Sequence, residues 1–117
     1  MPTELPESGA REMLLWLLRL RRRVGVTGAS MIPNLKPGDE VLVNSRAYRR
    51  RTPHIGDVVL ARRPDREAVT LIKRVSTVQE DGCLLLLGDN PASSTDSRTF
   101  GPITRHHIVG KVTSKFG

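Results

Sequence analysis

Aromatic residues are scarce in this sequence, and their scarcity limits the surfaces that it can build. Only four of the 117 residues are aromatic: Trp16, Tyr48, Phe100 and Phe116. Aliphatic side chains must therefore fill the core. The stacking platforms on which many proteins bind single-stranded nucleic acid are largely excluded, so we expect no nucleic-acid partner.

Cysteine is almost absent as well. The single Cys83 excludes an internal disulfide and any metal site built from several cysteines. Because Cys83 stands in the run CLLLL, we expect an inert thiol in the core. The three histidines, His54, His106 and His107, have positions typical of the surface or of a cavity rim. We expect neither a cofactor nor a metal ion.

Long apolar runs are also missing. The only membrane-like stretch, MLLWLL at residues 13–18, is shorter than the roughly 20 apolar residues of a spanning helix. Arginines follow this run, whereas in a cleavable export signal the positive charge comes first. We therefore expect a cytoplasmic protein, with peripheral membrane contact through residues 10–23 as an open alternative.

Positive charge is abundant and clustered. Nineteen Lys and Arg against twelve Asp and Glu give a net charge of +7, and arginines gather at residues 19–23 and 46–51. Such clusters suggest an anionic partner, namely nucleic acid, anionic lipid or an acidic protein. A solubilising surface is the simpler interpretation. A further hypothesis is that residues 46–51 dock an acidic face of a folded substrate.

The N-terminal region, residues 1–23, predicts one short amphipathic helix. Apolar residues recur there at i, i+3, i+4 and i+7, which predicts a helix over residues 10–22. The apolar residues are Met13, Trp16, Leu17 and Leu20, widened by Leu14, Leu15 and Leu18. Packing on the domain is our main expectation for this helix, and contact with a membrane surface or a partner is the alternative.

Residues 24–117 predict a mostly β domain. Short apolar runs there are separated by Gly, Pro and Asp. Gly-Asp turns lead into expected strands at Glu40 to Asn44 and Val58 to Arg62, and AVTLIKRVSTV, CLLLLGDN and HIVGKVTSKF predict further strands. We expect about six strands and one short N-terminal helix.

Ser30, in the stretch TGASMIPNL, becomes a nucleophile only if a base accepts its proton. Among the four lysines, Lys73 is the best placed to be that base. Strand alternation puts it on the same face as Val69, Leu71 and Val75, while Arg74 can face water. Burial among apolar side chains would lower the pKa of Lys73 and favour the neutral amine.

A polar segment, GDNPASSTDSRTFGP at residues 88–102, supplies further chemistry. Its hydroxyl groups can hydrogen-bond a neutral amine, and Asp96 and Arg98 can each pair with an opposite charge across a tight turn. A polar surface loop is the simpler interpretation. From the residues alone, a Ser/Lys hydrolase is one hypothesis beside it.

Four segments, taken in order, resemble the signal peptidase I family of Ser/Lys endopeptidases. They are SMIPNLKPGDEVLV, LIKRV, GDNPASSTDSRTFGPI and IVGKV, and the resemblance runs from about Val24 to the C-terminus. The resemblance implies a signal-peptidase/LexA-like β domain. It implies that Ser30 is the nucleophile, that Lys73 is its general base and that Ser94 orients the lysine amine.

The same resemblance implies roles for the surrounding residues. Asp96 and Arg98 fall on the pair that holds the loop, and Met31 would shape the substrate pocket. The Ser30 backbone N–H would meet the oxyanion. Some members place a serine hydroxyl two residues before the nucleophile, but Gly28 stands there in this sequence, which leaves the second donor open.

Only fourteen residues, Arg74 to Leu87, separate Lys73 from Gly88. This compact arrangement is most similar to the nickel-type superoxide dismutase maturation proteases. It implies a serine endopeptidase that removes an N-terminal propeptide from a precursor, namely the nickel superoxide dismutase proenzyme.

Three alternatives remain open. The first is a generic signal peptidase that cleaves secretory precursors at a membrane surface. The second is a LexA-like self-cleaving regulator, although only 29 residues precede Ser30, too few for a helix-turn-helix domain. The third is a non-catalytic basic module that binds nucleic acid or acidic protein, for which a strong salt dependence without proteolysis would be the signature.

Overall fold

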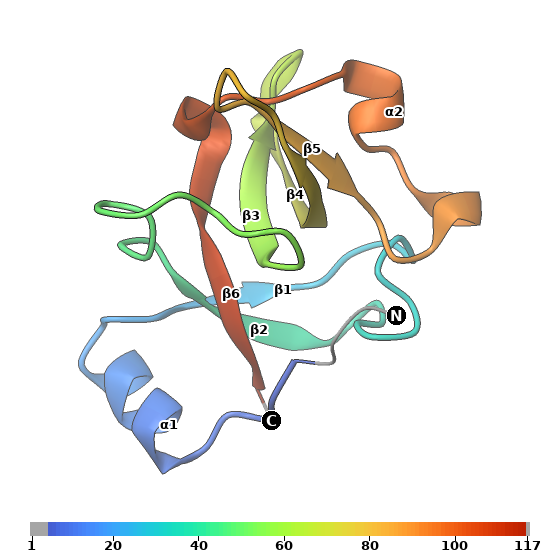
Figure 1. Ribbon diagram of the computed structural model, residues 1–117. Helices are drawn as coiled ribbons and strands as arrows, with labels where there is room; N and C mark the ends of the chain where they lie inside the picture. Colours follow the sequence, from blue (N-terminus) through green and yellow to red (C-terminus); the bar gives the residue numbers. More distant parts are fainter. Residues whose placement is uncertain (1–4, 117) are drawn as a thin grey trace.

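Six strands form one antiparallel sheet in the computed structural model, which describes residues 5–116 (Figure 1). The strands are β1 (Arg22–Gly25), β2 (Glu40–Asn44), β3 (Val58–Arg63), β4 (Arg66–Val78), β5 (Leu84–Leu87) and β6 (Ile108–Phe116). Their order in the sheet is β1-β2-β6-β3-β4-β5, so β6 lies between β2 and β3. The expected mostly β fold of about six strands is confirmed.

The helical elements are short. They are α1 (Ala10–Leu17), α2 (Ser97–Phe100) and two 3-10 turns, η1 (Pro91–Ser93) and η2 (Arg105–His107). Both α2 and η1 lie in the polar segment that follows β5, so this segment is an ordered loop beside the sheet (Figure 1).

Two similar turns fix where β2 and β3 begin. The Asp39 carboxylate accepts the backbone N–H of Lys36 at 2.8 Å, and the Asp57 carboxylate accepts that of His54 at 3.0 Å. In each turn the Asp backbone N–H also donates to the carbonyl of the same partner residue at 3.0 Å, so each is a β-turn that reverses the chain just before a strand. The Glu40–Asn44 strand was predicted with the correct bounds, and β3 ends at Arg63, one residue later than predicted.

Strand β3 is buried on both faces. Val58 and Leu60 belong to one core cluster, whereas Val59 and Ala61 belong to the other. Because successive side chains of a strand point to opposite faces, the two clusters lie on the two sides of β3. The first cluster includes Met31 and therefore supports the floor of the site described below.

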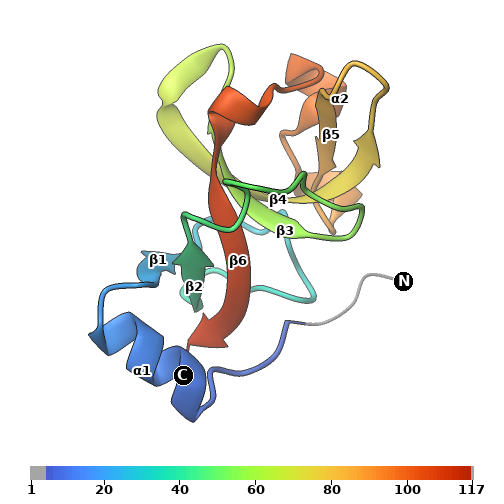
Figure 2. The same cartoon turned by 60° about the vertical axis from the view of Figure 1, so that its left-hand side comes forward.

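The helix α1 is shorter than the predicted span of residues 10–22. Leu18 caps it, Arg19 has a φ of +62°, and Arg22 already pairs with Val43 of β2. Pairing with the sheet overrides the helical periodicity after residue 17. The sheet also begins two residues before the predicted domain start at residue 24, so the helix leads directly into β1 (Figure 2).

One face of α1 packs on the domain, as expected. The Glu12 carboxylate accepts hydrogen bonds from the hydroxyls of Thr113 and Ser114, and the Trp16 ring meets Phe116 edge to face at 5.0 Å between centroids. The other face carries exposed leucines, which are considered below. No helix among residues 5–116 has the length and apolar character needed to cross a membrane.

Candidate active site

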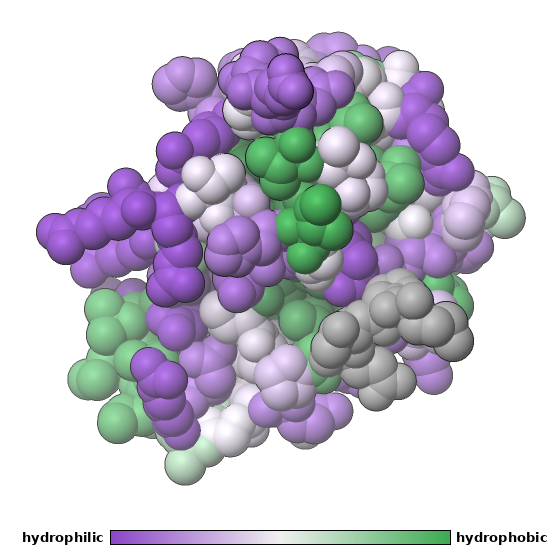
Figure 3. All heavy atoms as spheres, in the orientation of Figure 1, coloured by the Kyte–Doolittle hydropathy of each residue, from purple (hydrophilic) through white to green (hydrophobic). Residues whose placement is uncertain are grey.

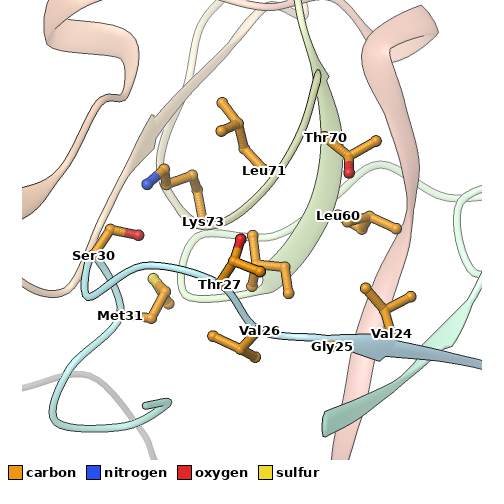
Figure 4. Close-up of a pocket in the computed structure, with 11 residues that line it drawn as sticks. Val24, Gly25, Val26, Thr27, Ser30, Met31, Leu60, Thr70, Leu71 and Lys73 are labelled. Carbon is orange, nitrogen blue, oxygen red and sulfur yellow. The ribbon is translucent and has the colours of Figure 1, made fainter. Parts of the chain in front are cut away.

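A cavity of about 110 Å³ lies between β4 and the loop that follows β1 (Figure 4). Its lining residues are residues 24–27, Ser30, Met31, Leu60 and residues 70–73. The cavity therefore brings Ser30 and Lys73, which the sequence places far apart, to one space. Figure 4 shows the Ser30 hydroxyl and the Lys73 amine both pointing into it.

Hydrogen bonds from the polar segment hold the backbone of the Ser30 loop. The Asn90 backbone N–H donates to the Ser30 carbonyl oxygen at 2.7 Å, and the Asn90 side-chain amide donates to the Ala29 carbonyl at 3.1 Å. Gly28 has a φ of +76°, a conformation that glycine adopts at little cost. Within residues 5–116, the Ser30 backbone N–H has no acceptor, so it is free to bind a ligand.

Lys73 comes from β4 and is only 3% exposed. Its neighbours across the sheet and along the buried face include Val59 and Val75. Burial lowers the pKa of Lys73; the Asp96 carboxylate opposes this shift, and the Arg98 guanidinium adds to it. In the described part of the chain, the amine forms no hydrogen bond or salt bridge. When the amine is neutral, its lone pair is therefore available to accept a proton.

Asp96 is fully buried and organises the loop beside the cavity. Its carboxylate accepts hydrogen bonds from the Arg98 side chain at 2.8 and 3.0 Å, from the Ser94 hydroxyl at 2.6 Å and from the Gly88 N–H at 3.0 Å. Burial alone would raise the pKa of Asp96, but these hydrogen bonds together hold it well below its usual range. Asp96 is therefore a permanent anion near Lys73.

Ser94 lies close to both Ser30 and Asp96. Its hydroxyl donates to Asp96, and in residues 5–116 it forms no hydrogen bond with Lys73. The remaining lone pairs of the hydroxyl can accept a bond from an amine. A side chain at Gly88 would lie 2.2 Å from the Ser94 Oγ and 2.8 Å from the Ser30 carbonyl oxygen. This close approach packs the Ser94 segment against the Ser30 loop, and the orienting role of Ser94 stays a prediction.

A second buried pair links the same segments, and the strand pattern did not reveal it. Arg74 donates two hydrogen bonds to the Asp89 carboxylate, at 2.9 and 3.0 Å, and Asn34 donates to the same carboxylate at 2.7 Å. Strand alternation left Arg74 able to face water, and in the structure its side chain is only 12% exposed. Strand alternation correctly placed Arg74 on the face of β4 opposite Lys73. It could not show that Arg74 pairs with Asp89, because Asp89 lies in a distant segment, in the Gly-Asp-Asn motif.

Two further residues line the cavity. Met31 is almost fully buried and forms part of its wall. Thr27, which none of the sequence motifs indicates, directs its side-chain oxygen into the cavity, beside Ser30 (Figure 4). Within residues 5–116, no group of three His, Cys, Asp or Glu side chains is arranged to bind a metal ion.

Comparison with known proteins finds one matching family. The model of the family described as "Signal peptidase, peptidase S26" matches residues 13–81 and 76–116. These spans include all the residues that line the cavity, together with the polar segment.

Individual relatives agree with this match. The chain is 30% identical to mitochondrial inner membrane protease subunit 1 of Xenopus tropicalis and 34% identical to mitochondrial ATP-independent inner membrane protease subunit 1b of Arabidopsis thaliana. Each alignment covers 74% or 73% of this chain but only 63% of the relative. The chain is also 30% identical to signal peptidase I V of Bacillus subtilis, over 75% of this chain and 81% of that protein.

Proposed function

The chain belongs to the peptidase S26 family of signal peptidases, and from this premise we propose that it is a serine endopeptidase with Ser30 as nucleophile and Lys73 as general base. One observation carries the proposal: both side chains enter the same cavity, and the lysine there is buried. A lowered pKa of Lys73 enlarges the fraction of neutral amine that can accept a proton.

The reaction follows from the positions of these groups. The Ser30 oxygen attacks the scissile carbonyl carbon while its proton passes to the Lys73 amine. Collapse of the tetrahedral intermediate breaks the C–N bond, and the Lys73 ammonium returns the proton to the leaving amine. The neutral lysine then removes a proton from the water that hydrolyses the ester, and the proton goes back to the Ser30 oxygen.

Two donors are available for the oxyanion. The first is the Ser30 backbone N–H, which has no acceptor within residues 5–116. The second is the Thr27 hydroxyl, which also faces the cavity beside Ser30. It would donate the hydrogen bond that Gly28, which has no side chain, cannot supply. Such a donor is worth about 10²–10³ in rate.

The polar segment positions these reacting groups. Asp96 and Arg98 hold the loop, and Ser94, anchored on Asp96, accepts a hydrogen bond from the Lys73 amine as the proton moves. Met31 forms the wall against which a substrate side chain packs. A cavity of about 110 Å³ accommodates small side chains next to the cleaved bond.

The substrate class proposed is a precursor protein that loses an N-terminal segment. The relatives are described as a signal peptidase and as inner membrane proteases, so they favour a generic precursor peptidase at a membrane surface over one dedicated substrate. For the same reason, a membrane surface is favoured over the bulk cytoplasm as the place of action.

The nickel superoxide dismutase proenzyme is the second candidate substrate. It rests on the compact spacing of the three motifs, with fourteen residues between Lys73 and Gly88. The relatives named above give it no support. A LexA-like self-cleaving regulator and a non-catalytic basic module are weaker alternatives, because the matching family is one of signal peptidases.

The test is to incubate the protein with a secretory precursor and with a nickel superoxide dismutase proenzyme, and to read each N-terminus by intact mass. Wild type should cut at least one precursor, whereas Ser30→Ala and Lys73→Ala should cut neither. Lys36→Ala, which removes a lysine from a surface turn, is the matched control and should remain active. Cleavage by Ser30→Ala or by Lys73→Ala would exclude the proposed dyad.

A further inference from the structure

A larger cavity, of about 360 Å³, lies between α1 and the loop that joins β2 to β3. Its charged lining residues are Arg11, Arg21, Arg51, Lys111 and Asp57. We call it the arginine cavity. It shares no lining residue with the cavity of Ser30 and Lys73, so it is a separate site.

Among the residues that the structure describes, two of these cations have no carboxylate close enough to form a salt bridge. Arg21 pairs with Glu12 at 3.1 Å, and the Lys111 amine lies 3.8 Å from the Asp57 carboxylate. Within residues 5–116, neither Arg11 nor Arg51 forms a salt bridge. The cavity therefore has a surplus of two guanidinium groups, which suit a phosphate because each presents several N–H donors in one plane.

Exposed apolar side chains lie on α1, which supplies Arg11 to this cavity, and in the residues just after α1. Four leucines form what we call the leucine patch: Leu14, Leu17, Leu18 and Leu20, which are 56%, 68%, 60% and 42% exposed. Arg11 precedes Leu14 by three residues and Leu18 by seven, so an α-helical path places all three on one face. In Figure 3 the hydrophobic spheres over α1 lie directly below hydrophilic side chains that project to the left.

We infer that the arginine cavity binds the phosphate of an anionic phospholipid, while the leucine patch inserts among the acyl chains of the same membrane surface. A phospholipid joins a phosphate to apolar chains. This face joins exposed leucines to two guanidinium groups that form no salt bridge within residues 5–116. Helices that lie in a membrane interface also carry basic side chains, which contact anionic headgroups, together with apolar side chains that enter the acyl region.

Other anionic partners suit this face less well. A nucleic acid would contact the arginines and leave the leucines in water. An acidic protein would require an apolar strip beside its carboxylates, whereas a lipid bilayer offers both features everywhere on its surface. The inference deepens the membrane location proposed above, but it does not depend on the peptidase chemistry.

The test measures binding to lipid vesicles by the Ser30→Ala variant. Because binding does not require peptidase activity, the result can be interpreted even if the proposed peptidase function is wrong. Vesicles of phosphatidylcholine are compared with vesicles that also contain phosphatidylglycerol. The variant Arg11→Gln/Arg51→Gln should bind the anionic vesicles about thirtyfold more weakly. Arg62→Gln/Arg66→Gln, an equal change in charge on exposed residues of β3 and β4, should bind like its parent.

The leucine patch is tested with Leu14→Ser/Leu18→Ser, which should bind anionic vesicles more weakly even at high salt. Far-ultraviolet circular dichroism checks that each variant is folded. The assignment of the cavity would be overturned if the protein bound both kinds of vesicle equally. It would also be overturned if the two double arginine variants lost the same amount of affinity for anionic vesicles. Self-association that the leucine variant abolishes would also overturn the inference, because a second copy would then cover the patch.

Discussion

The backbone N–H of Asn90 donates to the carbonyl oxygen of Ser30 at 2.7 Å, and the Asn90 side chain reaches the Ala29 carbonyl at 3.1 Å. The serine loop is thus held by a segment that follows β5. Both bonds bind the backbone and leave the serine hydroxyl free for chemistry.

Asn90→Ala removes only the side-chain bond to Ala29. We expect a loss of about 1 kcal/mol in the free energy of unfolding and a fall in kcat of about 10- to 100-fold, because a small displacement of the nucleophile is costly. Chemical denaturation and steady-state kinetics measure the two effects. Asn44→Ala removes a comparable side-chain bond to the Arg46 N–H and should leave kcat unchanged. An unchanged kcat in Asn90→Ala would mean that the loop is fixed without this bond.

Lys73→Met exchanges a buried amine for an apolar side chain of similar length. Peptidase activity should fall by about 10⁴–10⁶-fold, while stability near neutral pH should rise. In the wild type the pKa of Lys73 is lowered on folding, so the unfolded chain binds more protons between the folded pKa and about 10.4. Wild-type stability therefore rises with pH in that window, and the advantage of Lys73→Met should shrink there. Denaturation at several pH values measures this trend, and a constant difference would contradict it.

The pH dependence of kcat/KM should show an acid limb that reflects protonation of Lys73, with a midpoint below about 10.4. Activity should be lost as pH falls through this pKa, because the ammonium cannot accept the serine proton. The Arg98 guanidinium contributes to the lowered pKa of Lys73, so Arg98→Gln should move the limb to higher pH. Arg66→Gln, on an exposed part of β4, is the control. A limb that stays in place or moves to lower pH in Arg98→Gln would contradict this assignment.

Gly88→Ala would place a methyl group 2.2 Å from the Ser94 Oγ and 2.8 Å from the Ser30 carbonyl oxygen. We expect a cost of about 1–3 kcal/mol in stability and a strong loss of kcat, because the clash moves the nucleophile loop. Gly110→Ala is the matched control, since its methyl group would meet the Asn44 carbonyl at 2.7 Å, away from the active-site cavity. At a temperature where both variants are folded, only Gly88→Ala should lose kcat. Equal kcat values would show that the loop tolerates the displacement.

Thr27→Val keeps the shape of the side chain and removes its hydroxyl. If this hydroxyl stabilises the oxyanion, kcat should fall by about 10²–10³ with little change in KM. Thr27→Ser restores the donor and should recover most of the rate. A rise in KM alone would instead assign Thr27 to substrate binding.

The strands and the buried lysine were predictable because each depends on local pattern. The turn before Glu40 and the burial of Lys73 beside Val75 both depend on a few consecutive residues, and the structure agrees with them. Val69, which alternation placed on the same face, is 40% exposed because the start of β4 extends beyond the core. The end of α1 was not predictable, because the pairing of Arg22 with Val43 competes with the helix from a distance along the chain.

The residues of the candidate site also fall into two groups, those that a local motif indicates and those that only the fold reveals. The motifs indicated Ser30, Lys73 and Asp96, and the structure brings them together. The Arg74–Asp89 pair joins two distant segments, and no pattern of consecutive residues predicts that contact. Thr27 lines the cavity because of the path that the loop after β1 takes. Side chains whose partners lie in distant segments need the fold before their roles can be recognised.

The central place of β6 has a consequence for biosynthesis. Strands β1 and β2 adjoin the Ser30 loop, and β4, which pairs with β3, carries Lys73. Within the sheet, these two pairs of strands are joined only through β6. A chain that emerges from the ribosome therefore cannot complete the sheet beside Ser30 and Lys73 until residues 108–116 have been made. If Ser30 and Lys73 act together as proposed, a nascent chain that lacks β6 is therefore expected to show no peptidase activity.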